Sequence, residues 1–554
     1  MLHFHAPKQL ISLLAVAIVA LPVFAVPASA APAPARLDDE VSQRLQTATA
    51  SQRIPVIVEG SPEGDGAGRA LRAESRVLSG GGVVVGSSSL LGASVAELTP
   101  SQIRTLADDP SVGRIHIDAE VKATAINDAD TSVGGQTPIV FQQAIGATQA
   151  WEDGFTGKGV TVAVLDTGID DNNPAFGSRV KARVDLIDPT HPALGDPAGH
   201  GTHLAGIIAA GRDAPSPGIA PDAELVSVRV LDQNGSSRLS TVIHGLEWAI
   251  AHKSSLGIRV VVMALGAPAQ GGYRHDPLAA AAEIAWRSGL VLVTAAGNDG
   301  PGAGTIETPG IDPLVLTVGA SDDNGTVALA DDSIPFWSSV GPTPDGLAKP
   351  ELVAPGRKIV SVRVPGSTLD VQSPTHIEGP TTIRFSGTSE STAVAGGAAA
   401  LLLQQRPELS PDETKALLVG GARPLAGSSA AVQGAGLINV ERALNARTPQ
   451  VVRPHLLPAE GLILALLPLF GDLQGDGPAD GHQFGDGNQG INADHVRWDH
   501  VRWDEVRWDD VRWDHVRWDE VRWDHVRWDH VRWDHVRWDH VRWDQVRWDG
   551  TVYD

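Results

Sequence analysis

The chain has 554 residues, a formal net charge of −23 and no cysteine. Its length allows several domains, and the lack of cysteine excludes a disulfide scaffold, a thiolate zinc site and a cysteine nucleophile. An acidic chain repels nucleic acid and anionic membrane surfaces, so neither is expected as a partner.

The first thirty residues have the pattern of a secretory signal peptide. Lys8 precedes an apolar run from Leu10 to Val26, and residues 28–30 (Ala-Ser-Ala) supply an A-x-A cleavage site. A membrane anchor that is never cleaved is the alternative. The later apolar stretch 461–471 is shorter than the roughly 18 residues that a spanning helix needs. We therefore expect residues 1–30 to be a signal peptide, the protein to be secreted, and the mature chain to have no membrane span.

A small α+β unit is predicted after this signal. Thr99 and Pro100 mark one helix start, because threonine caps a helix and proline suits its first position. The expected elements follow the order βαββαβ, which is typical of a compact α+β domain. They are a strand at 54–58, a helix at 66–78, two strands within 83–98, a helix from 99 and a strand at 113–117. A polar segment from about 125 to 147 is interpreted as a linker.

Residues from about 148 to 447 alternate apolar strands with capped helices. Helix starts are marked by Asp276-Pro277 and by a capping box formed by Ser410 and Glu413. Continuous apolar runs, as buried parallel strands require, occur at 160–165, 258–263 and 290–294. This alternation predicts an α/β fold with a doubly wound, mostly parallel sheet.

Three segments of this region carry residues suited to nucleophilic catalysis. Asp166 ends an apolar strand in VAVLDTG, at the sheet edge where ligands of open α/β sheets bind. His200 starts a helix in GHGTHLAG, and Ser389 starts a long apolar helix in FSGTSESTAVAG. A serine hydroxyl needs an adjacent base, histidine supplies that base, and a buried carboxylate fixes the imidazole tautomer. The three residues together indicate a Ser-His-Asp arrangement.

A fourth segment supplies a group for the oxyanion. The strand in LVLVTAAGN ends at Asn298, whose side-chain amide can donate to a developing oxyanion. Ser389 lies at a helix start, which also offers backbone N–H groups to negative charge.

The order Asp, His, Ser and these motifs resemble the subtilase family (peptidase family S8) over roughly residues 148–447. The resemblance implies a serine endopeptidase that cleaves polypeptides through an acyl-enzyme, with Asp166, His200 and Ser389 as catalytic triad and Asn298 in the oxyanion hole. No cofactor is needed for that chemistry. Structural calcium is common in the family, but no segment of this chain can be assigned as a site.

The resemblance extends to the substrate groove and the upstream unit. It implies that Ala264, Leu265 and Gly266 bind the substrate backbone through main-chain groups. Asp299 is either a solvated turn residue or part of the rim of the primary specificity pocket. The upstream unit resembles the family's inhibitory propeptide, so we expect a zymogen whose own propeptide is an intramolecular inhibitor. The expected domains are a propeptide at 31–135, a peptidase domain at 136–447, a linker at 448–494 and repeats at 495–554.

The chain departs from the family pattern after the nucleophile. Residues 390–394 read Glu-Ser-Thr-Ala-Val, where the family has methionine, alanine, serine or threonine, proline and histidine. Glu390 corresponds to a residue that faces the leaving-group side in the family, so its carboxylate is expected to disfavour acidic residues after the scissile bond. The same departure supports an alternative function, a catalytically impaired subtilase-like scaffold for binding or surface adhesion.

Other polar residues near the motifs have plainer interpretations. His203 could pair with His200 on a metal, but zinc takes three or four protein ligands and no third ligand stands out, so His203 is expected to be structural. Ser386 and Ser391 are alternatives to Ser389 as nucleophile, and are interpreted as turn or helix hydrogen-bonding residues.

The C-terminal segment is a tandem repeat. Eleven copies of VRWD plus one variable residue run from Val496 to Asp549. A period of five gives no apolar stripe on a continuous strand or helix. A solenoid with one turn per repeat, a low-complexity tail, a segment that contacts cell wall or other macromolecules at the cell surface, and weak metal binding by the histidines at the variable position all stay open. Those histidines are at 495, 500, 515, 525, 530, 535 and 540.

Overall fold

The computed structural model describes residues 36–124, 137–193 and 195–451, together with the backbone of eleven Arg-Trp-Asp triplets between residues 497 and 549. The expected signal peptide, most of the 448–494 linker and the histidines at the variable position of the repeat lie outside the described residues. The chain divides into two compact units, residues 1–473 and 474–554, each of which is described by itself.

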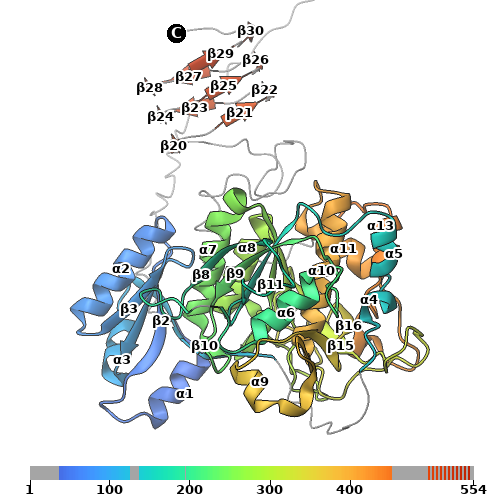
Figure 1. Ribbon diagram of the computed structural model, residues 1–554. Coiled ribbons are helices and arrows are strands. Elements are labelled where there is room, and N and C mark those ends of the chain that lie inside the picture. The colour runs from blue at the N-terminus through green and yellow to red at the C-terminus, as the bar shows by residue number, and fades with distance from the viewer. Residues whose placement is uncertain are drawn as a thin grey trace, which may run out of the picture. The chain divides into compact units, whose positions relative to one another are not determined.

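An α+β unit with one five-stranded sheet opens the described chain (blue in Figure 1). Its sheet has the order β1-β5-β2-β4-β3, and Thr99 caps the last helix through a capping box with Gln102. The strands are β1 Arg36–Leu37, β2 Ile54–Gly60, β3 Val83–Ser88, β4 Ala93–Leu98 and β5 Val112–Ile117, and the helices are α1 Asp39–Thr47, α2 Gly66–Ser79 and α3 Pro100–Ala107. The predicted order βαββαβ is present, and β1 and α1 precede it.

A seven-stranded parallel sheet forms the centre of the following domain. Its order is β16-β15-β13-β11-β7-β9-β8, and every neighbouring pair is parallel. The strands are β7 Thr161–Asp166, β8 Val180–Asp185, β9 Glu224–Arg229, β11 Ile258–Met263, β13 Val291–Ala295, β15 Leu316–Ser321 and β16 Leu352–Pro355. The three apolar runs recognised in the sequence are β7, β11 and β13, which lie side by side in the middle of the sheet because they are buried on both faces. The predicted doubly wound α/β fold is confirmed.

Helices cover this sheet in contacting pairs. The helix α6 packs against α10 and β7, and α7 packs against α8 and β11. The larger helices are α6 His200–Ala209, α7 Leu239–Leu256, α8 Pro277–Arg287, α10 Thr388–Gln405 and α11 Pro411–Gly421, and the shorter ones are α4 Phe141–Ala144, α5 Ala147–Glu152, α9 Thr368–Gln372, α12 Ala430–Gln433 and α13 Val440–Asn445. The helix α4 lies inside the segment interpreted as a linker to residue 147, where Phe141 and Ala144 are buried in the core. None of the helices in the described ranges is long and apolar enough to cross a bilayer.

Two small sheets complete this unit. A three-stranded antiparallel sheet has the order β17-β19-β18, and a four-stranded sheet has the order β10-β6-β12-β14. The strands are β17 Ile359–Val362, β18 Ile377–Gly379, β19 Thr382–Phe385, β6 Glu120–Ala123, β10 Ser236–Arg238, β12 Leu265–Pro268 and β14 Glu307–Thr308. In the second sheet β6, which follows the N-terminal unit directly in the chain, lies between two strands of the larger domain.

The repeat segment forms short parallel strands, β20 Arg497–Asp499 to β30 Arg547–Asp549, with one strand in each repeat. Each strand pairs in register with the strand twenty residues later, so that Arg497 is opposite Arg517 and Trp498 is opposite Trp518. Twenty residues contain four repeats, so the backbone turns once every four repeats rather than once per repeat. A period of five therefore places tryptophan positions opposite each other in paired strands without one continuous strand.

Candidate active site

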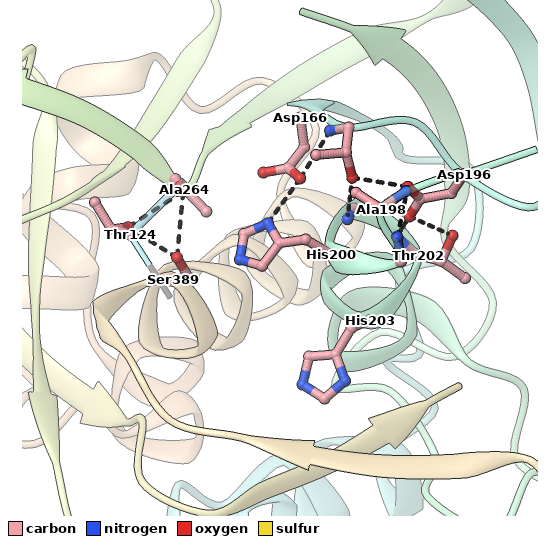
Figure 2. Close-up of polar contacts among 12 residues, drawn as sticks. Thr124, Asp166, Asp196, Ala198, His200, Thr202, His203, Ala264 and Ser389 are labelled. Atoms are coloured by element: carbon pink, nitrogen blue, oxygen red, sulfur yellow. Dashed lines mark hydrogen bonds and ion pairs between the residues drawn. The ribbon is translucent and has the colours of Figure 1, made fainter. Parts of the chain in front are cut away.

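Asp166 and His200 are joined by a hydrogen bond at the carboxyl end of the parallel sheet. His200 Nδ1 lies 2.7 Å from Asp166 Oδ1, which also accepts a hydrogen bond of 2.8 Å from the backbone N–H of Thr167 (Figure 2). Asp166 ends β7, and His200 is the first residue of α6. Gly199 precedes it with φ +90°, a conformation that glycine adopts without strain.

The electrostatic balance at His200 favours the imidazolium ion. Burial by itself would lower the pKa of His200, but the charge and the hydrogen bond of Asp166 outweigh burial and raise that pKa to about 9. His200 Nε2 has no hydrogen-bond partner among the described residues, so in the neutral imidazole this nitrogen can take a proton. The arrangement suits a histidine that accepts a proton on Nε2 while the aspartate holds Nδ1–H.

Asp196 holds the start of α6 in place. Its Oδ1 accepts hydrogen bonds of 2.8 Å from the backbone N–H of Gly199 and from the Thr167 hydroxyl, and its Oδ2 accepts two of 2.8 Å from the backbone N–H and hydroxyl of Thr202 (Figure 2). Asp196 is not among the site residues predicted from the sequence. Asp196 lies four residues before the first residue of α6 and three before its N-cap Gly199, and the sequence alone does not connect it to Thr167 beside Asp166.

Ser389 is the second residue of α10 and is fully buried. Its Oγ lies 3.2 Å from the carbonyl oxygen of Ala264 and 2.8 Å from Thr124 Oγ1 (Figure 2). No hydrogen bond joins it to His200, whose Nε2 has no partner among the described residues. Rotation about the Cα–Cβ bond of Ser389 changes the direction in which Oγ points, since a serine side chain has one such torsion.

Asn298 points its amide N–H group at the carbonyl of Thr124. Its Oδ1 accepts hydrogen bonds of 3.1 and 3.0 Å from the backbone N–H and the hydroxyl of Thr388, and its Nδ2 donates to the Thr124 carbonyl oxygen. Thr388 therefore fixes which end of the Asn298 amide faces the carbonyl. An amide donor held in this way needs no reorganisation when negative charge forms on that oxygen.

The strand β6 and Thr124 after it lie beside Ser389 as an extended peptide that pairs with β12. Ala123 is opposite Leu265 and Lys122 is opposite Gly266 in an antiparallel pairing, and the Thr124 N–H donates to the Ala264 carbonyl over 3.1 Å. The structure thus brings the segment 264–266 against the backbone of a peptide. Thr124 was not predicted from the sequence. It contacts Ser389 although the two are 265 positions apart, and nothing in the local sequence indicates such a contact.

Glu390 and His203 form a buried pair beside the site. The Glu390 Oε1 atom lies 3.6 Å from His203 Nε2, and both side chains are fully buried. The structure therefore turns the Glu390 carboxyl towards His203 in α6, and the expectation that it faces the leaving-group side gains no support from this position. Burial raises the pKa of Glu390 to about 7, against the smaller opposing effect of His200. Burial, with a smaller contribution from His200, lowers the pKa of His203 to about 3.

The remaining candidates have ordinary surroundings. Ser391 Oγ donates to the Ala354 carbonyl, and Ser386 Oγ accepts from the Lys358 N–H, as expected of helix and turn residues. Asp299 is exposed next to Asn298, and its N–H donates to Ser339 Oγ. Within the described ranges no group of three or more His, Cys, Asp or Glu side chains is placed to hold a metal ion.

Comparison with known proteins gives one consistent result. The model of the subtilase family matches residues 157–437. The serine protease AprX of Bacillus subtilis is 39% identical over 360 residues, which cover 63% of this chain and 78% of AprX. Subtilisin NAT of Bacillus subtilis subsp. natto is 32% identical over 366 residues, which cover 66% of this chain and 83% of that protein.

The fold comparison agrees with this result. The crystal structure of fervidolysin from Fervidobacterium pennivorans, a keratinolytic enzyme related to subtilisin, superposes with a TM-score of 0.59 at 21% identity. The match covers 76% of this chain and 64% of fervidolysin. The chain therefore belongs to the subtilase family, and the sequence-based prediction of a subtilisin-like serine endopeptidase is confirmed.

Proposed function

We propose that Ser389 is the nucleophile of a serine endopeptidase made as a secreted zymogen. Two contacts of Thr124 support this proposal. Its carbonyl oxygen accepts a hydrogen bond from Asn298, and its Oγ1 lies 2.8 Å from Ser389 Oγ. A peptide carbonyl is thus already polarised by an amide donor, in a residue whose side chain contacts the Ser389 hydroxyl. Such placement supplies the proximity and the charge stabilisation that acyl transfer requires.

The proposed chemistry follows from the hydrogen bonds of the site and needs no cofactor. Ser389 Oγ attacks the carbonyl carbon while its proton passes to His200 Nε2, and the oxyanion accepts from Asn298 Nδ2 and the Ser389 N–H. Asp166 holds His200 Nδ1–H over 2.7 Å and stabilises the imidazolium ion. The C–N bond then breaks, His200 returns the proton to the leaving amine, and water hydrolyses the acyl-enzyme by the same two steps.

The N-terminal unit fits the role of an intramolecular inhibitor. Asp118 accepts two hydrogen bonds from Ser240 at the start of α7, of 2.9 Å from its N–H and 2.7 Å from its hydroxyl. Farther along α7, Glu247 Oε1 accepts 2.8 Å hydrogen bonds from the Ser88 hydroxyl and the Leu90 N–H. These contacts hold the unit on the peptidase while β6 fills the groove, so other polypeptides are excluded until it is released.

We further propose where the zymogen is cut. The carbonyl that accepts from Asn298 belongs to Thr124, whose hydroxyl contacts Ser389, and this supports a scissile bond between Thr124 and Ala125. This position lies within residues 122–140, where the sequence leads us to expect the cut, and ahead of the expected domain boundary at residue 135. The signal pattern in residues 1–30 supports export, and association with a cell surface through the repeat segment is a further proposal that the repeat composition supports.

A fluorophosphonate probe and mass spectrometry test this function. The secreted protein should be labelled after the N-terminal unit has been removed, and a Ser389→Ala variant should not be labelled and should keep its uncut N-terminal unit. The mature chain should begin at Ala125. Absence of labelling in the processed wild-type protein would favour the impaired scaffold instead, and a different mature N-terminus would overturn the proposed cut.

A further inference from the structure

Glu307 belongs to the same small sheet as the bound strand. In the order β10-β6-β12-β14, Glu307 starts β14, and β12 lies between it and β6. Glu307 is opposite Pro268 in β12, and its N–H donates to the Ala296 carbonyl over 3.0 Å. The residue is therefore tied by its backbone to both segments that flank the substrate groove, β12 and the loop that leads to Asn298.

Two glycines make room for the Glu307 side chain. A Cβ atom added to Gly266 would collide with Glu307 Oε2, and one added to Gly297 would lie 2.8 Å from Cγ and 2.9 Å from Cδ of Glu307. The carboxyl group therefore lies over the backbone of Gly266 and beside that of Gly297. Any other residue at either position would fill the space that the carboxyl occupies.

The same two segments hold the residue whose carbonyl is attacked, called P1 here. The Thr124 N–H donates to the Ala264 carbonyl, two residues before Gly266, and the Thr124 carbonyl accepts from Asn298, one residue after Gly297. The P1 residue thus lies between the two segments against which Glu307 packs. Glu307 and the P1 residue share this part of the groove.

The Glu307 carboxyl forms no ion pair with any residue that the structure describes. Its Oε2 is buried and has no hydrogen-bond partner among the described residues. Burial raises the pKa of Glu307 to about 7, and the charge of the neighbouring Asp299 raises it further in the same direction. A buried carboxylate without a partner is costly, and a cation that enters beside it removes much of that cost.

We propose that Glu307, assisted by Asp299 at the rim, makes this peptidase prefer lysine or arginine at P1. The inference rests on the proposed function of Ser389 and adds the substrate class. A long basic side chain follows the groove between the two glycine-bearing segments and brings its charge to the Glu307 carboxylate. An aliphatic side chain leaves the carboxylate unpaired, and an acidic one repels it.

Thr124 does not use this carboxylate. Its hydroxyl lies 2.8 Å from Ser389 Oγ and 3.2 Å from the Ala264 carbonyl, so the short side chain is engaged near the backbone. Cleavage after Thr124 occurs within one chain, where the bond is held in position without help from the P1 side chain. Polypeptides that arrive from solution lack that advantage and depend on the P1 contact.

The test compares matched peptide substrates that differ only at P1, with lysine, arginine, methionine or glutamate, on the processed enzyme. At pH 8 the ratio of kcat/KM for lysine over methionine should be about tenfold or more. Glu307→Gln should lower that ratio by about tenfold, Asp299→Asn by less, and Glu307→Lys should favour glutamate over lysine. Glu408→Gln is the matched control and should leave the ratio unchanged, because Glu408 is exposed and interacts with Arg259 at the start of β11, the end of that strand away from Ala264.

The pH dependence provides a readout that needs no variant. The lysine-to-methionine ratio should rise between pH 6 and pH 8, because Glu307 loses its proton over that range. Ionisation of His200 affects both substrates equally and cancels in the ratio. A wild-type ratio near one, or a ratio unchanged in Glu307→Gln, overturns the P1 inference while hydrolysis continues. Absence of hydrolysis and of fluorophosphonate labelling would instead refute the proposed function itself.

Discussion

The carboxyl oxygen Oε1 of Glu390 lies 3.6 Å from Nε2 of His203, and both side chains are fully buried. Glu390 follows Ser389 in α10, and His203 is three residues after His200 in α6. The low pKa of His203 keeps its imidazole neutral, and the pKa of Glu390 near 7 means that this carboxyl gains its charge close to neutral pH. The charge of Glu390 contributes to the raised pKa of His200. A second carboxyl thus acts on the proposed general base.

We expect Glu390→Gln to move the acid limb of the pH profile of kcat/KM to lower pH. Loss of the carboxylate removes one of the groups that raise the pKa of His200, so His200 becomes neutral, and able to accept a proton, at lower pH. The profile is measured for wild type and variant, with Glu408→Gln as control. An unchanged acid limb would show that Glu390 does not act on His200.

Replacement of Asn298 by alanine should lower kcat by about 100- to 1,000-fold with little change in KM, because the lost hydrogen bond strengthens as the oxyanion forms. The uncut zymogen should also accumulate. Thr388→Val removes only the hydroxyl that orients the Asn298 amide, so its effect should be smaller. Equal losses in the two variants, or a loss confined to KM, would contradict this role of Asn298.

Asp196→Asn should lower both kcat and stability. The Asp196 carboxylate accepts hydrogen bonds from N–H and O–H donors on both oxygens, and an amide replaces one acceptor by a donor that faces them. The free energy of unfolding should fall by about 1–3 kcal/mol for buried donors left unpaired. Urea denaturation of Asp196→Asn in the inactive Ser389→Ala background measures stability. The kcat of Asp196→Asn with Ser389 intact measures the effect of a displaced His200. A stable variant with full activity would refute the positioning role.

The N-terminal unit should lose stability at alkaline pH through His116. This imidazole lies 2.6 Å from Asp38 and 2.8 Å from Glu59. Burial would lower the pKa of His116, but the two carboxylates raise it from 6.5 to about 10. A pKa raised in the folded state gives stabilisation that is complete below pH 6.5 and is lost as pH rises through 10.

Urea unfolding of the Ser389→Ala zymogen between pH 6 and pH 10 checks this expectation. The transition of the N-terminal unit should move to lower urea concentration as pH rises, and His116→Gln should flatten that dependence. A pH dependence that survives in His116→Gln would assign the effect to other groups.

Elements with local signals could be predicted from the amino-acid sequence. Apolar runs predicted β7, β11 and β13, since buried parallel strands need no polar face. Capping residues located α3 and α11, because Thr99 and Ser410 satisfy N–H groups within their own first turns. The order of the motifs indicated the family and identified Asp166, His200 and Ser389 as candidate catalytic residues.

Contacts between distant parts of the chain could not be predicted from the sequence and are visible only in the tertiary structure. Thr124 meets Ser389 across 265 positions, and Glu307 reaches the groove because Gly266 and Gly297 leave space for it. Each of these relationships depends on which surfaces pack together and on how much water they exclude. Burial of that kind also sets the pKa values of Glu390 and Glu307, since the cost of a charge depends on its surroundings rather than on its neighbours in sequence.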